Sequence, residues 1–263
     1  GSVAKYIAVS TLEATFDVAS MAKTSTKVFV LEVMGRHAGW IAAAGAMASN
    51  KEMDLPIVIL FPEIAFDKAR FLAKVGTMVK KYGYCTVVVS EGVKGTDGKF
   101  LSDQGLRDAF GHAQLGGVAP VIAGIVKEGL NLKYHWGVAD YLQRAARHIA
   151  SKTDVAQAYA TGKAAVELAI KGRNSVMPAI KRVSDKPYKW KIEVAELKNV
   201  ANKEKFMPRD FITADGFGIT EKCRKYLAPL ILGEDYPPYR NGLPRYVRLK
   251  NVGVKKKLGE FKV

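Results

Sequence analysis

Three short apolar runs constrain the fold of this chain more than any other feature of its sequence. The runs are "KVFVLEVM" (27–34), "PIVILFPE" (56–63) and "CTVVVSE" (85–91), and their apolar residues follow one another without polar alternation. A strand with one face in water alternates apolar and polar residues, so continuous runs predict strands covered on both faces. Helical spacing separates the runs, at 39–49 and 67–81. This order predicts an α/β fold with a parallel sheet flanked by helices.

The remaining sequence extends this pattern. Asp67 is expected to cap the second of those helices, and Thr153 and Gly172 to bound a later one. After Gly172, two strand-like runs and a short helix predict a small strand and helix tail. The further elements are expected at 2–22, 117–128 and 154–171 (helices), at 132–138, 175–184 and 189–197 (strands), and at 220–231 (the tail helix).

The charge of the chain predicts an anionic ligand. Lysine and arginine number 41 against 25 aspartate and glutamate residues, a formal net charge of +16. The basic residues are scattered and form no long stripe, no arginine-rich arm and no nucleic-acid-binding module. Small phosphorylated metabolites and nucleic acid are both candidate anions, and the alternative is a plain solvated surface. Because the basic residues are scattered, we expect no nucleic-acid partner.

The apolar runs and the cysteines further narrow the class of protein. No apolar run approaches the roughly 20 residues of a membrane helix, and no basic leader opens the chain, so we expect no membrane partner and a cytoplasmic protein. Cys85 and Cys223 are the two cysteines, and we expect both to be buried thiols that act as small hydrophobes.

Three predicted strands end in distinctive groups: "MGR", "PE" and "SE". Ligands of parallel sheets bind at the carboxyl ends of strands, so we expect the chemistry there. In the first group, Gly35 lets a ligand approach the main chain, and Arg36 offers a planar cation suited to phosphate oxygens. A following helix start would add free backbone amides. The alternative is a helix-capping loop with a surface arginine, and the pattern alone does not separate the two.

Two other groups are weaker candidates. Glu91, in "VVVSEG", would accept hydrogen bonds from sugar hydroxyls, or it is a solvated turn residue. "YLQR" places the phenol of Tyr141 and the guanidinium of Arg144 three residues apart. Phosphate-loop and dinucleotide fingerprints are not matched, and the four histidines show no metal-ligand spacing.

Together these segments resemble the phosphofructokinase family, which phosphorylates fructose 6-phosphate on its C1 hydroxyl. "EVMGRHAGWIA" (32–42) resembles that family's sugar-phosphate motif, "VVVSEG" its carboxylate-bearing strand end and "DYLQRA" its phosphate-gripping segment. The closing segments 207–223 and 233–244 are similar to the longer, pyrophosphate-using bacterial branch. The resemblance covers essentially the whole chain and implies a Rossmann-like, phosphofructokinase-type fold.

The resemblance implies roles for individual residues. Met34, Gly35 and Arg36 would hold the sugar phosphate, with Arg36 also near the transferred phosphoryl group. Glu91 would bind sugar hydroxyls, and Tyr141 and Arg144 would grip the 6-phosphate. The family also takes basic residues from a neighbouring subunit, which implies at least a homodimer. One such position is Lys27 here, and the second falls near Lys133 or His135.

The same resemblance implies that two of the family's functional segments are missing from this sequence. The family's Gly-Gly-Asp donor loop and its "TIDND" segment, which supplies the general base, do not occur in this sequence. The chain therefore resembles the carboxyl-terminal two-thirds of the family's proteins, without a catalytic base and without ligands for the Mg²⁺ of the complete enzyme. We expect this chain to bind fructose 6-phosphate weakly at best and not to turn over.

The resemblance also implies a division of the chain into three regions. It does not decide which phosphoryl donor the protein uses. We expect a helix at 1–26 that belongs to or bridges from a donor domain, a sugar-phosphate-binding domain at 27–172, and an extension at 173–263 that packs back on the core. Apolar surface is expected on the first helix. Pyrophosphate is the expected donor, with ATP as the alternative, and a non-catalytic sugar-phosphate-binding or assembly role is a second alternative.

Overall fold

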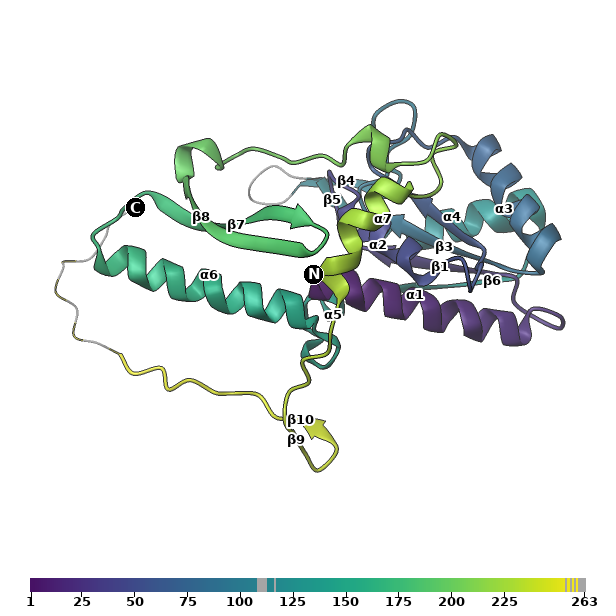
Figure 1. The fold of residues 1–263 in the computed structure, drawn as a ribbon. Helices are drawn as coiled ribbons and strands as arrows, with labels where there is room; N and C mark the ends of the chain where they lie inside the picture. Colours follow the sequence, from purple (N-terminus) through teal and green to yellow (C-terminus); the bar gives the residue numbers. More distant parts are fainter. Residues whose placement is uncertain (108–112, 116, 254, 256, 258, 260–263) are drawn as a thin grey trace.

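A four-stranded parallel sheet forms the centre of the protein (Figure 1). The computed structural model describes residues 1–107, 113–115, 117–253, 255, 257 and 259. The sheet has the order β2-β3-β1-β6, and all its pairings are parallel, which confirms the predicted sheet. Its strands are β1 (Val28–Val33), β2 (Ile57–Leu60), β3 (Cys85–Ser90) and β6 (Tyr134–Val138).

Helices cover both faces of the sheet, as the continuous apolar runs predict. In β1, Val28 and Val30 belong to one core cluster, and Leu31 and Val33 to the other. The first cluster includes side chains of α3 (Lys68–Tyr82) and α4 (Ala119–Leu130), and the second those of α1 (Ser2–Met21) and α2 (Trp40–Gly45). Each large apolar side chain buried in this way contributes about 1.5–3 kcal/mol to stability.

Side-chain caps mark the starts of two of the longer helices. Asp67 caps α3 as predicted, because its side chain accepts a hydrogen bond of 3.0 Å from the amide of Arg70. The prediction that Thr153 bounds the later helix is wrong. That helix, α6 (Lys152–Ile170), is capped by Ser151, which has an extended backbone and whose hydroxyl accepts from the Asp154 amide.

The other elements are short strands and helices. The hairpin of β7 and β8 and helix α7 were predicted, whereas the pairs β4–β5 and β9–β10 and the single-turn helix α5 were not. These elements are α5 (Leu142–Ala145), α7 (Glu221–Leu227), β4 (Asp103–Arg107), β5 (Ala113–Leu115), β7 (Val176–Asp185), β8 (Tyr188–Glu196), β9 (Tyr239–Arg240) and β10 (Leu243–Pro244).

Part of the carboxyl-terminal extension packs on the sheet domain. Met207, Phe211 and Leu227 belong to the core cluster that also contains Ile7 of α1. Cys85 and Cys223 are free and fully buried, as expected. Burial raises the pKa of each of these two thiols to about 12, so neither is a reactive thiolate near neutral pH. The predicted region boundaries stay a prediction.

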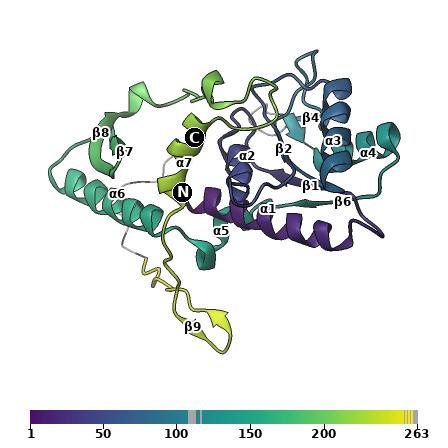
Figure 2. The same cartoon turned by 45° about the vertical axis from the view of Figure 1, so that its right-hand side comes forward.

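Large apolar side chains are more exposed on α6 than on the first helix, where exposed apolar surface was expected. Tyr159, Val166 and Ile170 of α6 are 76%, 60% and 81% exposed, whereas Phe16 is the exposed large apolar residue of α1. In both ribbon views α6 and the β7–β8 hairpin lie to one side of the sheet domain (Figures 1 and 2). A two-stranded ribbon on one helix encloses no core of its own, so these apolar side chains stay in water.

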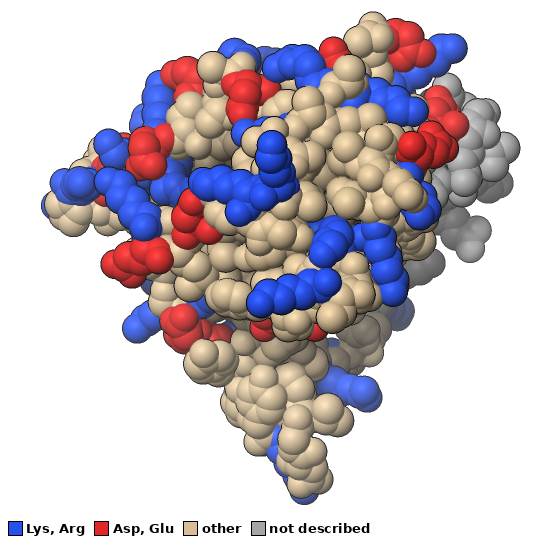
Figure 3. Space-filling view, turned by 90° about the vertical axis from the view of Figure 1, so that its right-hand side faces the viewer, with Lys and Arg blue, Asp and Glu red and all other residues tan. Residues whose placement is uncertain are grey.

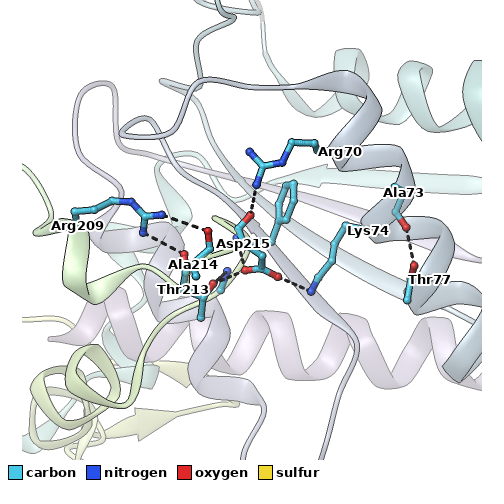
Figure 4. Close-up of polar contacts among 10 residues, drawn as sticks. Arg70, Ala73, Lys74, Thr77, Arg209, Thr213, Ala214 and Asp215 are labelled. Atoms are coloured by element: carbon cyan, nitrogen blue, oxygen red, sulfur yellow. Dashed lines mark hydrogen bonds and ion pairs between the residues drawn. The ribbon is translucent and has the colours of Figure 1, made fainter.

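A loop of the extension is fastened to the sheet domain through Asp215 (Figure 4). Its carboxylate accepts hydrogen bonds from Lys74 Nζ at 2.7 Å, from Thr213 Oγ1 at 2.6 Å and from the Phe217 amide at 3.2 Å. The Phe217 carbonyl in turn accepts from the amide of Ile59 in β2 at 2.9 Å. The loop 213–218 therefore binds both α3 and the outer edge of the sheet.

Asp215 should make the stability of the protein sensitive to acid. Burial raises its pKa, but the hydrogen bonds from Lys74, Thr213 and Phe217 outweigh burial and lower the pKa from 3.8 to about 2. A depressed carboxyl pKa stabilises the fold above about pH 4, and the contribution is lost as the pH falls toward 2. We expect Asp215→Asn to lower the Tm at pH 7 and to have less effect at pH 3, measured by thermal denaturation. An equal loss of Tm at both pH values would contradict this assignment.

Candidate substrate-binding site

The carboxyl ends of β1, β3 and β6 meet around a hollow of about 220 Å³. Met34 follows β1, Glu91 follows β3 and Asp140 follows β6, so three strand ends supply its polar wall. This is the edge at which the sequence predicts the chemistry. The hollow is lined by Glu32, Val33, Met34, Glu91, Gly117, Val138 and Asp140.

Gly35 and Glu91 are in direct contact. The Gly35 amide donates to Glu91 Oε1 at 3.1 Å, and the Gly35 carbonyl accepts from Ser90 Oγ at 2.5 Å. Gly35 has a φ of 140°, and a Cβ there would lie 2.7 Å from the carbonyl oxygen of Ala38. The turn after β1 therefore requires glycine and is fixed to the end of β3.

Gln143 joins the "YLQR" segment to the same turn, a role that the sequence analysis missed. The side chain is 2% exposed, its Oε1 accepts from the Met34 amide at 3.3 Å, and its Nε2 donates to the Asp140 carbonyl at 2.8 Å. A buried amide must satisfy both of its ends, and Gln143 does so by bridging two strand ends. The sequence signal for the role of Gln143 was its position between Tyr141 and Arg144.

The expectation of free amides at the helix start is not met at Gly39, the residue that precedes α2. Helix α2 begins at Trp40, four residues after Arg36, and the Gly39 amide donates to the carboxylate of Glu63. The amides of Met34 and Gly35 donate to Gln143 and Glu91. Three amides between the end of β1 and the start of α2, those of Met34, Gly35 and Gly39, therefore already have side-chain acceptors.

The guanidinium of Arg36 has no hydrogen-bond acceptor or carboxylate partner within the described ranges. Its carbonyl packs against Gly92, which directly follows Glu91. Arg147, by contrast, is paired with Asp235, and Arg224 donates to the carbonyl of Ser49 at 2.8 Å. A guanidinium that is half-buried and unpaired is available to an anionic ligand.

Arg144 and Tyr141 are the two members of the predicted phosphate grip, and the guanidinium of Arg144 stacks on the ring of Tyr141. The Arg144 guanidinium lies 4.5 Å from the centre of the Tyr141 ring, and Tyr141 is 63% exposed. Arg144 lines a second hollow of about 250 Å³, which Gln143 also lines. The structure thus brings Met34 and Glu91 to one hollow and places Arg144 at its neighbour, with Gln143 in contact with both.

Lys27 lies at the opposite end of β1. Seven steps of about 3.3 Å along the strand separate it from Met34, a distance of about 23 Å. Its ammonium donates to the Ala22 carbonyl, and its amide donates to the Lys133 carbonyl at 2.8 Å. Lys27 and Lys133 are therefore neighbours, but they do not join the other site residues within one chain. Their expected role in a second subunit's site stays a prediction.

Glu32 is a buried acid beside the hollow. It is 6% exposed, and it accepts a hydrogen bond of 2.8 Å from the amide of Ala119 at the start of α4. Burial raises its pKa, the amides of Ala119 and Val118 partly offset this, and the nearby carboxylates of Glu91 and Asp140 raise it again. The single carboxylate in the apolar run "VFVLEV" was the sequence signal for this residue.

Neither a metal cluster nor a membrane helix is found in the part of the chain that the structure describes. No group of three or more His, Cys, Asp or Glu side chains there could hold a metal ion. The expectation that the Mg²⁺ of the complete enzyme is held by residues outside this sequence stays a prediction. No helix among the described residues is long and apolar enough to cross a bilayer. On the face shown in Figure 3, basic side chains are interspersed with acidic and uncharged ones rather than joined in one field.

These features define a class: a Rossmann-like α/β protein with a polar hollow at its parallel strand ends and, on the adjoining turn, an arginine that has no partner among the described residues. The family described as "Phosphofructokinase" matches residues 7–169. The chain belongs to the phosphofructokinase family.

Relatives of known structure or name agree with this assignment. The chain is 67% identical over all its 263 residues to a pyrophosphate--fructose 6-phosphate 1-phosphotransferase from Halomonas elongata, of which it covers 63%. It is 68% identical to the protein of that name from Methylococcus capsulatus, matching 98% of this chain and 61% of the relative. A crystal structure of pyrophosphate-dependent phosphofructokinase from Nitrosospira multiformis has 71% sequence identity to this chain and a TM-score of 0.89. The match covers 100% of this chain and 62% of the chain in that structure. The chain thus spans less than two-thirds of these proteins.

Proposed function

We propose that this chain is the fructose 6-phosphate-binding portion of a pyrophosphate-dependent 6-phosphofructokinase. The observation that carries the proposal is the guanidinium of Arg36, which has no acceptor among the described residues and directly follows Gly35, whose amide donates to Glu91. A cation on a turn that a carboxylate holds suits a ligand with both phosphate and hydroxyl groups. The names of the Halomonas elongata and Methylococcus capsulatus relatives support this substrate.

Each site residue has a proposed part in binding. Arg36 pairs with phosphate oxygens near the group being transferred, and Glu91 accepts hydrogen bonds from sugar hydroxyls. Tyr141 and Arg144 bind the 6-phosphate. Lys27 serves the site of a neighbouring subunit, in a homo-oligomer of at least two chains. A lysine there neutralises charge without the bidentate geometry of arginine.

Phosphoryl transfer depends on the position of both reactants and on neutralisation of their charge. This chain supplies the acceptor side alone, because its sequence has neither the family's donor loop nor its base segment. In the complete cytoplasmic enzyme of glycolysis, Mg²⁺ would be held by residues outside this sequence and would neutralise the donor. Pyrophosphate is the proposed donor because the names of the relatives specify it and because the closing segments of this chain resemble those of the pyrophosphate-using branch. An ATP-dependent enzyme or a non-catalytic sugar-phosphate-binding subunit are the alternatives.

Thermal denaturation tests the proposal directly. A ligand that binds only the folded state raises the Tm, so millimolar fructose 6-phosphate is expected to raise the Tm of the 263-residue chain by a few degrees. Duplex DNA is expected to leave it unchanged. The same protein with pyrophosphate and Mg²⁺ is expected to form no fructose 1,6-bisphosphate in a coupled assay. A shift with DNA and none with the sugar phosphate would reject the proposed function, and product formation would reject the acceptor-only role.

A further inference from the structure

The carboxylate of Glu63 joins the turn after β1 to the carboxyl-terminal extension. Its Oε1 accepts hydrogen bonds from the Gly39 amide and from the Met207 amide, both at 3.0 Å. Its Oε2 lies 3.1 Å from the same Gly39 amide. Glu63 follows β2, so one side chain connects three segments that are far apart in sequence.

The contact with Gly39 is close. A Cβ at position 39 would lie 2.8 Å from Glu63 Oε2 and 2.8 Å from the ring of Phe61. Gly39 itself is buried. The carboxylate therefore packs directly against the main chain three residues after Arg36, where water has little access to replace it.

The extension contacts the same turn at two further points. Glu204 forms an ion pair with His37, and the Lys205 carbonyl accepts a hydrogen bond of 2.8 Å from Trp40 Nε1. With the link through Glu63, segment 204–207 therefore contacts residues on both sides of Gly39. Every one of these contacts falls within four residues of Arg36.

We propose that Glu63 is a positioning residue, which sets the backbone of residues 35–39 and makes the carboxyl-terminal extension part of the frame of the binding site. The consequence for the sugar phosphate rests on the proposed function. A guanidinium binds phosphate well only in a defined orientation, and that orientation follows from the main chain of the turn. Glu63 thus acts through Arg36 and does not contact the ligand.

Glu63→Gln, compared with Asp215→Asn, tests this inference. Glutamine keeps one acceptor oxygen but turns an NH₂ group toward an amide donor. Asp215→Asn also weakens the attachment of the extension, but on α3 rather than at the turn. Hydrogen–deuterium exchange of the peptide that covers residues 34–41 reports the turn without any ligand. Calorimetric titration with fructose 6-phosphate reports the site.

We expect Glu63→Gln to speed exchange at residues 37–40 about tenfold and to raise the Kd for fructose 6-phosphate by about the same factor. Asp215→Asn, at a similar loss of Tm, should change each quantity less than twofold. Equal effects of the two variants on exchange, or no effect of Glu63→Gln on exchange or on a measurable Kd, would overturn the inference. If the wild-type chain fails to bind the sugar phosphate, the proposed function falls, while the exchange result still decides the role of Glu63.

Discussion

Replacing Arg36 with alanine is expected to weaken the binding of fructose 6-phosphate by ten- to a hundredfold. A hydrogen bond to a charged group contributes about 1.5–3 kcal/mol, and each 1.4 kcal/mol changes a dissociation constant tenfold. Arg36 has no acceptor among the described residues, so its loss leaves no buried partner unpaired. The effect should therefore appear in the Kd from calorimetric titration and leave the Tm without ligand within about one degree.

Two further variants make this prediction specific. Arg36→Lys retains the charge but loses the planar fork, so it should fall between wild type and alanine. Arg240→Ala removes an exposed arginine from strand β9, and the Kd should not change. If Arg240→Ala weakened binding as much as Arg36→Ala, net charge rather than the site would hold the ligand.

Replacing Gly92 with alanine should have the largest effect on stability. A Cβ at this position would lie 2.6 Å from the Gly35 carbonyl oxygen and closer still to the Arg36 carbonyl. Both neighbours are backbone, so no side chain can move aside, and the turn itself must shift. We expect a loss of about 3 kcal/mol in the free energy of unfolding, the upper end of typical overpacking. Urea denaturation measures this loss, and binding of fructose 6-phosphate should be lost with it.

Gly162→Ala provides the matched control for Gly92→Ala. Gly162 lies in α6, and nothing is within 4 Å of the position that a Cβ would take. Alanine favours a helix over glycine by about 1 kcal/mol, so this variant should be more stable than wild type and bind the ligand normally. A Gly92→Ala protein as stable as wild type would show that the turn is not fixed between β1 and β3.

The main features of the fold follow from the sequence because they depend on local pattern. The apolar run of β1 and the capping residue Asp67 place a strand and a helix without knowledge of the rest of the chain. The start of α6 was missed because two hydroxyl residues, Ser151 and Thr153, both suit a cap. The choice between them depends on backbone angles that tertiary packing sets. Strand β9 was missed because two residues give no periodicity.

The site was predicted less completely because its geometry depends on contacts between distant segments. Gly35 and Glu91 were named from the pattern, and their amide-to-carboxylate contact connects residues 56 positions apart. Glu63 stood in the strand-end group "PE" and Gln143 was not singled out, but the partners of both are main-chain groups of distant segments. No residue type marks such a partner in a sequence. Long-range pairing of backbone groups is therefore what sequence reasoning could not supply here.

The two outer strands of the sheet differ in how open they are to another polypeptide. At β2, the carbonyl of Phe217 already occupies the amide of Ile59, so an incoming strand would have to displace the loop 213–218. At β6, the described residues place no further strand, and Trp136 is 47% exposed. A sheet with one free edge can pair with the same edge of a second copy across a twofold axis. It does not allow unlimited stacking into a fibre, because that growth needs both sides free.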